Sequence, residues 1–116
     1  MATVGEVILV WDRHTRPPKD KRHICICPIK QQFLRINSNP YFPPHHLLLY
    51  ANNTNILDHD SYVELNRILR HYASDINQAR SIGIMHQTER HALIAAAYNV
   101  TTLTDEQKDF IAAQLQ

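Results

Sequence analysis

The stretch "KDKRHICICPIKQQFLRINS", residues 19–38, decides the fold because it holds two strand patterns joined by a short link. "HICICPI" alternates isoleucine with cysteine, and Pro28, which has no N–H to donate, marks the end of this strand. "QQFLRINS" alternates between two faces, with Leu34 and Ile36 on one and Phe33 and Arg35 on the other. Since only residues 29–31 separate the two patterns, we predict a β-hairpin.

Further strand patterns lie on both sides of this hairpin. "VGEVILVW" is rich in β-branched and large apolar residues and predicts a strand over residues 6–11. "HHLLLYA" predicts a fourth strand over residues 45–51. "SYVELN" predicts a fifth over residues 61–66, with Tyr62 and Glu64 opposite Val63 and Leu65.

The last third of the chain changes to a helical period. "QTERHALIAAAYN", residues 87–99, is rich in alanine, the best helix former, and Asn99 suits the helix end. In "TDEQKDFIAAQL", Thr104 and Gln107 form a capping box, which predicts a helix beginning after Thr104. Five short strands followed by helices predict a small, strongly bent β-barrel over residues 1–68. A helical extension over residues 69–116 is expected to pack on the same domain.

Length and composition set limits on the function. A chain of 116 residues fits one domain, and a net charge of +1 gives no overall argument for nucleic acid. The chain has two glycines and no glycine-rich phosphate loop, which argues against nucleotide cofactors. No apolar run is long enough for a membrane helix, and no signal pattern opens the chain. We therefore expect a cytoplasmic protein without membrane contact.

The candidate metal ligands do not form a recognisable motif. Cys25 and Cys27 lie on one face of a strand, so we expect two buried packing residues rather than a disulfide or a zinc site. His45 and His46 are adjacent and face opposite ways, so they cannot easily share an ion. "DHD", residues 58–60, is best explained as a polar turn. We predict no metal and no cofactor.

The connection over residues 12–23 is the most basic part of the chain. It contains five cationic side chains and two acidic ones. Such a segment is either an arm that binds RNA phosphates or an ordinary solvated loop, and the composition leaves both interpretations open. Two adjacent prolines restrict its conformations, which lowers the entropy cost of ordering it on a ligand.

Several of these segments together resemble the MazF/PemK family of small SH3-like barrels, which includes toxin endoribonucleases. "GEVILVW" resembles the opening strand, and "KDKRHICICPI" resembles the basic loop and the strand after it. "FLRINS" is similar to the third strand and "LDHDSYVELNRI" to the closing element, so that the resemblance covers about residues 5–68.

The resemblance implies a metal-independent endoribonuclease, the toxin of a toxin-antitoxin system, that drives the 2′-hydroxyl of RNA onto the adjacent phosphate. Such a reaction needs a base, an acid and a cation facing the phosphorane. Carried over by position, the catalytic candidates are Arg22, Ser38, His14 and His23. The candidate RNA contacts are Arg13, Arg16, Lys19, Lys21 and Arg35. The resemblance also implies a homodimer and an antitoxin partner that occupies the RNA groove.

Two departures from the family pattern keep a second function open. Asn66 stands where some members have an aspartate, and an amide cannot accept a proton as a carboxylate does. His23 replaces the proline that usually follows the arginine. The alternative is therefore a catalytically inactive barrel that serves as an RNA- or protein-binding module.

Overall fold

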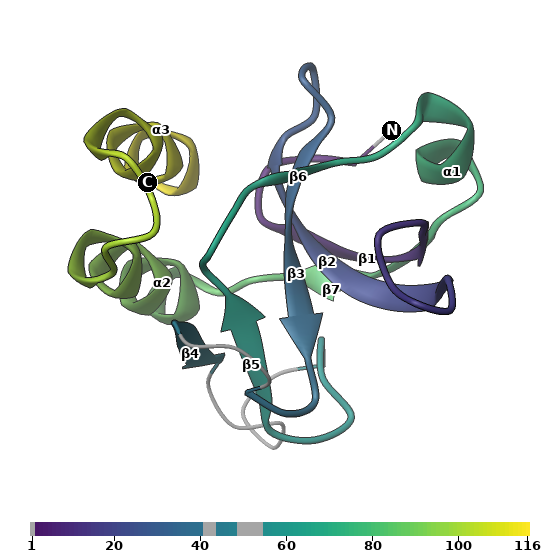
Figure 1. Cartoon of the computed structure of the whole chain (residues 1–116), viewed down its shortest axis with the longest axis horizontal. Coiled ribbons are helices and arrows are strands. Elements are labelled where there is room, and N and C mark those ends of the chain that lie inside the picture. Colours follow the sequence, from purple (N-terminus) through teal and green to yellow (C-terminus); the bar gives the residue numbers. More distant parts are fainter. Residues whose placement is uncertain (1, 41–43, 49–54) are drawn as a thin grey trace.

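The computed structural model describes residues 2–40, 44–48 and 55–116 and is mainly β, with three helices late in the chain (Figure 1). The first strands are β1 (Glu6–Asp12), β2 (Lys19–Cys27), β3 (Gln32–Asn37), β4 (His45–Leu48) and β5 (Ser61–Glu64). The second part contains β6 (Leu69–Arg70), α1 (Ala73–Asn77), β7 (Arg80–Ile84), α2 (Gln87–Asn99) and α3 (Asp105–Leu115).

The strands pair in the order β4-β5-β3-β2-β1-β7, all antiparallel, and β6 adds to β3 beside this path. The predicted β2–β3 hairpin is present, with His23 opposite Arg35 and Ile24 opposite Leu34. Among the described strands, β4 and β7 are the two ends of the path and do not pair with each other. The sheet is therefore not closed, and the expectation of a closed barrel is corrected on this point.

Strand β7 is the main element that the sequence did not predict. It lies within the segment expected to be a helical extension, yet it pairs with β1 from Glu6 opposite Ile84 to Leu9 opposite Arg80. The sheet thus takes in residues from both parts of the chain, and α1 lies in the connection between β6 and β7 (Figure 1). The predicted fourth strand begins at His45 as expected, and residues 49–51 lie outside the described residues.

The sheet buries apolar residues on both of its faces. Leu34 and Ile36 belong to the larger core, which the helices complete with Leu93, Ala97, Ile111 and Leu115. Phe33 and Cys25 belong to a smaller core on the opposite face, against Ile8 and Val10. The predicted alternation of β3 is confirmed, and it separates two environments on either side of the sheet.

The two long helices have the predicted limits. Thr104 caps α3 by accepting a hydrogen bond from the Gln107 amide at 3.1 Å, and the Gln107 side chain accepts the Thr104 amide at 2.9 Å. This confirms the predicted capping box. Both cysteines are buried and free, and burial raises the pKa of the Cys25 thiol to about 12, so Cys25 behaves as a packing residue. No helix in the described part of the chain has the length and apolar character needed to cross a membrane.

Candidate functional site

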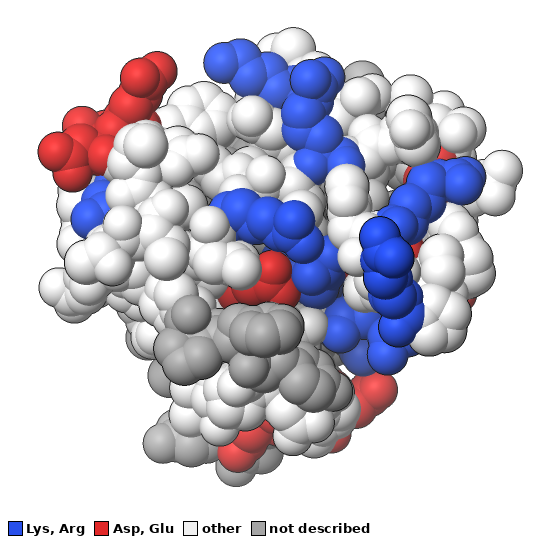
Figure 2. Space-filling view, in the orientation of Figure 1, with Lys and Arg blue, Asp and Glu red and all other residues white. Residues whose placement is uncertain are grey.

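Two pockets lie near the beginning of β2. The larger, about 570 Å³, follows the end of β1 and is lined by Arg13, His14, Gln31, Arg70, His71, Tyr72 and Asp75. The smaller, about 220 Å³, lies where β2 and β5 begin and β3 ends, and is named here the Arg22 pocket. Figure 2 shows Lys and Arg side chains gathered over the middle of the face that is turned toward the viewer, with a small acidic area recessed among them.

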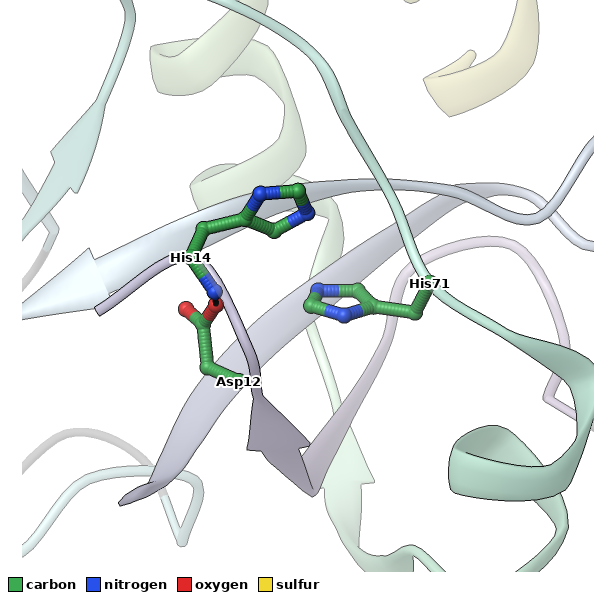
Figure 3. Close-up of side chains that lie close together, drawn as sticks. All are labelled: Asp12, His14 and His71. Carbon is green, nitrogen blue, oxygen red and sulfur yellow. Dashed lines mark hydrogen bonds between the residues drawn. The ribbon is translucent and has the colours of Figure 1, made fainter. Parts of the chain in front are cut away.

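The larger pocket borders a group of ring nitrogens and a carboxylate, named here the histidine cluster: Asp12, His14, His23 and His71. Asp12 is at the end of β1, His14 is in the following turn and His71 is just after β6, so distant segments meet here (Figure 3). One ligand atom from each of Asp12, His14 and His71 lies within 4.8 Å of the others. His23 completes the cluster from β2, with its Nε2 3.2 Å from Asp12 Oδ2.

The Asp12 carboxylate is fully buried and held from several sides. Its Oδ2 accepts a hydrogen bond from Arg35 Nε at 2.6 Å, and its Oδ1 accepts the backbone N–H of His14 at 2.8 Å. Burial by itself raises the pKa of Asp12, but the contacts with His23 and Arg35 outweigh burial and hold this pKa well below its usual range. Asp12 is therefore ionised at neutral pH.

His71 is 5% exposed, and its ring meets three other rings edge-on. The ring centroids lie 4.5 Å from His23, 5.5 Å from Phe33 and 5.7 Å from His14. Burial, with His23 adding to it, lowers the pKa of His71 to about 4. The imidazole is neutral at pH 7, and its Nε2 has no hydrogen-bond partner in the described part of the chain.

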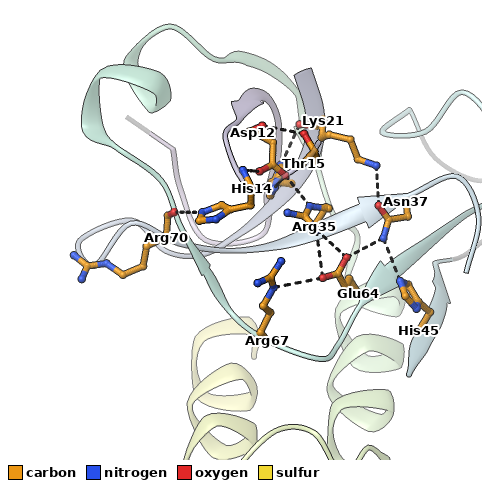
Figure 4. Close-up of polar contacts among 11 residues, drawn as sticks. Asp12, His14, Thr15, Lys21, Arg35, Asn37, His45, Glu64, Arg67 and Arg70 are labelled. Atoms are coloured by element: carbon orange, nitrogen blue, oxygen red, sulfur yellow. Dashed lines mark hydrogen bonds and ion pairs between the residues drawn. The ribbon is translucent and has the colours of Figure 1, made fainter. Parts of the chain in front are cut away.

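A polar network connects the histidine cluster with the Arg22 pocket (Figure 4). Arg35 is 7% exposed and lies between Asp12 and Glu64, with its Nη1 3.1 Å from Glu64 Oε2. The Asn37 amide donates to the same Glu64 oxygen at 3.0 Å, and Asn37 Oδ1 accepts Lys21 Nζ at 2.7 Å. Buried ion pairs of this kind need every member, because removing one leaves an uncompensated buried charge.

The Arg22 pocket collects side chains from the ends of three strands: Lys19, Asp20, Lys21 and Arg22 from β2, Asn37 and Ser38 from the end of β3, and His59 and Ser61 from the start of β5. Arg22 Nη2 makes an ion pair with Asp58 Oδ2 at 3.1 Å, and its Nε is buried without a hydrogen-bond partner among the described residues. Since Asp58 is 74% exposed, this pair is of the surface kind, which contributes only about 0–1 kcal/mol.

The electrostatics of this pocket favour an anion. Burial lowers the pKa of Lys21, and the positive charges of Lys19 and Arg35 lower it further, against a smaller opposite effect from Asp12 and Glu64. The charged residues that line the pocket are three cations, Lys19, Lys21 and Arg22, and one acid, Asp20. A phosphate bound there would relieve this repulsion and find hydroxyl and amide donors close by.

The predicted catalytic residues divide between the two pockets. Arg22 and Ser38 line the same pocket, as their assignment to one site requires. His14 lines the larger pocket, where its Nε2 lies 3.1 Å from the Arg70 carbonyl oxygen. His23 is fully buried on the other side of β2 from Arg22, because neighbouring strand residues point to opposite faces. The expected meeting of His14 or His23 with Arg22 is therefore corrected.

The predicted RNA contacts also separate. Lys19 and Lys21 line the Arg22 pocket, and Arg16 is exposed in the preceding turn. Arg13 is half exposed but bound to Asp75, with Nε 2.6 Å from Oδ2. Arg35 was predicted to contact RNA, and the structure corrects this, because its guanidinium is buried in the network with Asp12 and Glu64.

Sequence reasoning missed His59 and His71. His59 was assigned to a polar turn, and its place in the Arg22 pocket follows from the pairing of β5 with β3, which brings the start of β5 to the end of β3. His71 reaches the cluster through β6, whose pairing with β3 places the next residue beside Phe33. A signal was present at His23, since the hairpin register sets it opposite Arg35 and two such polar residues on one face need buried partners. Asn66 lines neither pocket.

The sequence matches no protein-family model and no curated protein. The MazF/PemK relationship stays a prediction.

Proposed function

We propose that this chain is a metal-independent endoribonuclease that cuts single-stranded RNA in the Arg22 pocket. The observation that carries the proposal is the meeting of a guanidinium, a hydroxyl and an imidazole, from Arg22, Ser38 and His59, in one cation-lined pocket. These groups come from three segments that are brought together by the pairing of β2, β3 and β5.

In the proposed reaction the 2′-oxygen of a ribose forms a bond to the adjacent phosphorus, and the bond from phosphorus to the 5′-oxygen breaks. His59 takes the proton from the 2′-hydroxyl, and Lys21, whose pKa is lowered by burial, gives a proton to the departing 5′-oxygen. Arg22 faces the phosphorane, where a planar guanidinium binds two oxygens and keeps its charge. Ser38 donates to a phosphate oxygen and positions it.

The resemblance to the MazF/PemK family suggests the cellular role and the partners of the chain. By analogy with MazF/PemK toxins and their SH3-like barrels, the chain acts in the cytoplasm as the toxin of a toxin-antitoxin pair. In the same analogy it is a homodimer whose RNA groove is occupied by an antitoxin. Trp11, a β1 side chain that is 42% exposed, is the apolar residue that we assign to the dimer contact.

The second candidate is an RNA-binding module that does not cleave. The ion pair between Arg22 and Asp58 favours it, because the carboxylate places a negative charge next to the guanidinium that the reaction needs. The three cations of the pocket are sufficient to hold an RNA backbone without any proton transfer.

Cleavage of a mixed single-stranded RNA pool in EDTA tests the proposal. We expect products with 2′,3′-cyclic phosphate and 5′-hydroxyl ends, no cutting of DNA of the same sequences, and loss of cutting in Arg22→Ala. Lys108→Gln, which removes one positive charge from α3, is the matched control and should cut like the natural chain.

Two results would decide against cleavage. If the natural chain and Arg22→Ala cut the pool equally, the activity does not belong to this pocket. If the natural chain cuts nothing but binds the pool in fluorescence anisotropy, and Arg22→Ala weakens that binding, the binding module is the correct function.

A further inference from the structure

The histidine cluster contains a buried imidazole nitrogen that the network leaves without a partner. Nε2 of His71 is buried and makes no hydrogen bond within the described residues, whereas Nε2 of His23 lies 3.2 Å from Asp12 Oδ2. Buried polar atoms nearly always have a partner, so an unpartnered nitrogen beside a buried carboxylate points to a ligand. Figure 3 shows the His71 ring directed toward Asp12 and His14.

The two ring nitrogens of His23 contact the backbone on one side and the Asp12 carboxylate on the other. Nδ1 lies 3.0 Å from the Lys21 carbonyl oxygen, and since a carbonyl only accepts, Nδ1 must carry the hydrogen. Nε2 lies 3.2 Å from Asp12 Oδ2, and a protonated His23 places its positive charge against this carboxylate. His23 therefore acts on the site through Asp12, as an outer partner that orients a ligating carboxylate.

The carboxylate of the cluster is also held in the manner of a metal ligand. Arg35 and the His14 amide bind Asp12 at 2.6 and 2.8 Å and fix its orientation. The charge of Arg35 is shared with Glu64, so the guanidinium does not face the cluster as an unpaired cation. The other charged pair at this pocket, Arg13 with Asp75, is neutral overall.

We propose that Asp12, His14 and His71, supported by His23, form a binding site for a transition-metal dication of the Zn²⁺ type. Imidazole nitrogens with one carboxylate oxygen are a preferred ligand set for Zn²⁺, Co²⁺ and Fe²⁺, whereas Mg²⁺ and Ca²⁺ prefer oxygen ligands. In a tetrahedral zinc site, bonds of about 2.0–2.1 Å place the ligand atoms about 3.3 Å apart. The three donors, which lie within 4.8 Å of one another, must move closer.

The exposed His14 side chain is the donor with room to move, and the pocket gives the ion a path. His14 is exposed and, together with His71, lines the pocket of about 570 Å³. Its Nε2 lies 3.1 Å from the Arg70 carbonyl oxygen, and that contact must be given up if this nitrogen binds the ion. The remaining coordination position faces the pocket and would hold water.

Metal titration of the chain freed of metal by EDTA and gel filtration tests this inference. We expect one Zn²⁺ per chain by calorimetry, a visible d–d spectrum with Co²⁺, and no heat with Mg²⁺. His71→Phe keeps the ring packing but removes the ligand nitrogen, and should weaken Zn²⁺ binding about 100-fold or more. His91→Gln, at an exposed α2 histidine, is the matched control for binding by surface histidines and should bind like the natural chain.

Equal Zn²⁺ binding in the natural chain and in His71→Phe would overturn the site, and so would a loss of binding in His91→Gln. If His71→Phe does not fold, as judged by near-ultraviolet circular dichroism, the same test applies to His14→Ala, whose side chain is exposed. The inference is independent of the RNA-cleavage proposal, because cleavage is measured in EDTA and metal binding is measured without RNA.

Discussion

The Arg22 pocket and the histidine cluster start from adjacent residues of β2 yet have opposite environments. Arg22 points to the face where β2, β3 and β5 end, close to Asp58, which is 74% exposed. His23 points to the other face and is fully buried against Asp12 and Phe33. The alternation of β2 therefore places Arg22 in a solvated, cation-lined pocket suited to anions and His23 in a buried donor set suited to a metal cation.

The largest effect is expected on RNA cleavage, from a substitution that changes only the Arg22 pocket. Removal of one preorganised donor facing a developing negative charge typically costs about 10²–10³-fold in kcat, and we expect this loss for RNA cleavage by Arg22→Ala. Arg22→Lys keeps the charge but not the planar fork, and should recover only part of the rate. Initial cleavage rates in EDTA measure both variants.

The same variant should leave the histidine cluster unchanged. Zn²⁺ binding by Arg22→Ala, followed by calorimetry, is expected to equal that of the natural chain. A parallel loss of cleavage and metal binding would mean that the two regions are one site, and the separation drawn here would be wrong.

The Arg35→Met variant is expected to lose fold stability, and this loss should affect both regions. This change leaves Asp12 and Glu64 buried without their cation, and breaking one partner of a buried network costs about 3–5 kcal/mol in the free energy of unfolding. Urea denaturation followed by circular dichroism measures the change. Glu64→Gln, which removes a charge but retains hydrogen-bonding atoms, should cost less. A destabilisation by Arg35→Met of under 1 kcal/mol would contradict the network.

The metal-free histidine cluster should make the fold sensitive to moderate acid. His71 has a pKa of about 4 in the folded chain and about 6.5 when unfolded, so between these values the unfolded state binds the proton and the folded state does not. Stability therefore falls as the pH drops from 6.5 to 4, by up to about 3 kcal/mol from this residue. Urea denaturation in EDTA at several pH values should show a smaller fall for His71→Phe. Identical slopes in the two chains would exclude His71 as the cause.

Local signals predicted the hairpin, the two faces of β3, both long helices and the Thr104 cap, because each depends on residues close in the sequence. Strand β7 was missed because its pattern "RSIGI" is short and weak, and it becomes a strand only by pairing with β1. The histidine cluster depends on His71, which β6 brings to β3. The burial of Arg35 likewise depends on Asp12 and Glu64, which lie on other strands, so no local pattern indicates it.

The smallest effect is expected from a variant in the helical part of the chain. This variant tests whether a lost activity comes from a change at one of the two sites or from a general loss of stability. Thr104→Ala removes the side-chain cap of α3 and should lower the free energy of unfolding by about 1 kcal/mol. Because α3 supplies Ile111 and Leu115 to the larger core and no residue to the histidine cluster or the Arg22 pocket, cleavage and Zn²⁺ binding at 25 °C should both be retained. If this variant lost either activity as strongly as Arg22→Ala or His71→Phe does, those losses would reflect unfolding rather than the chemistry of the sites.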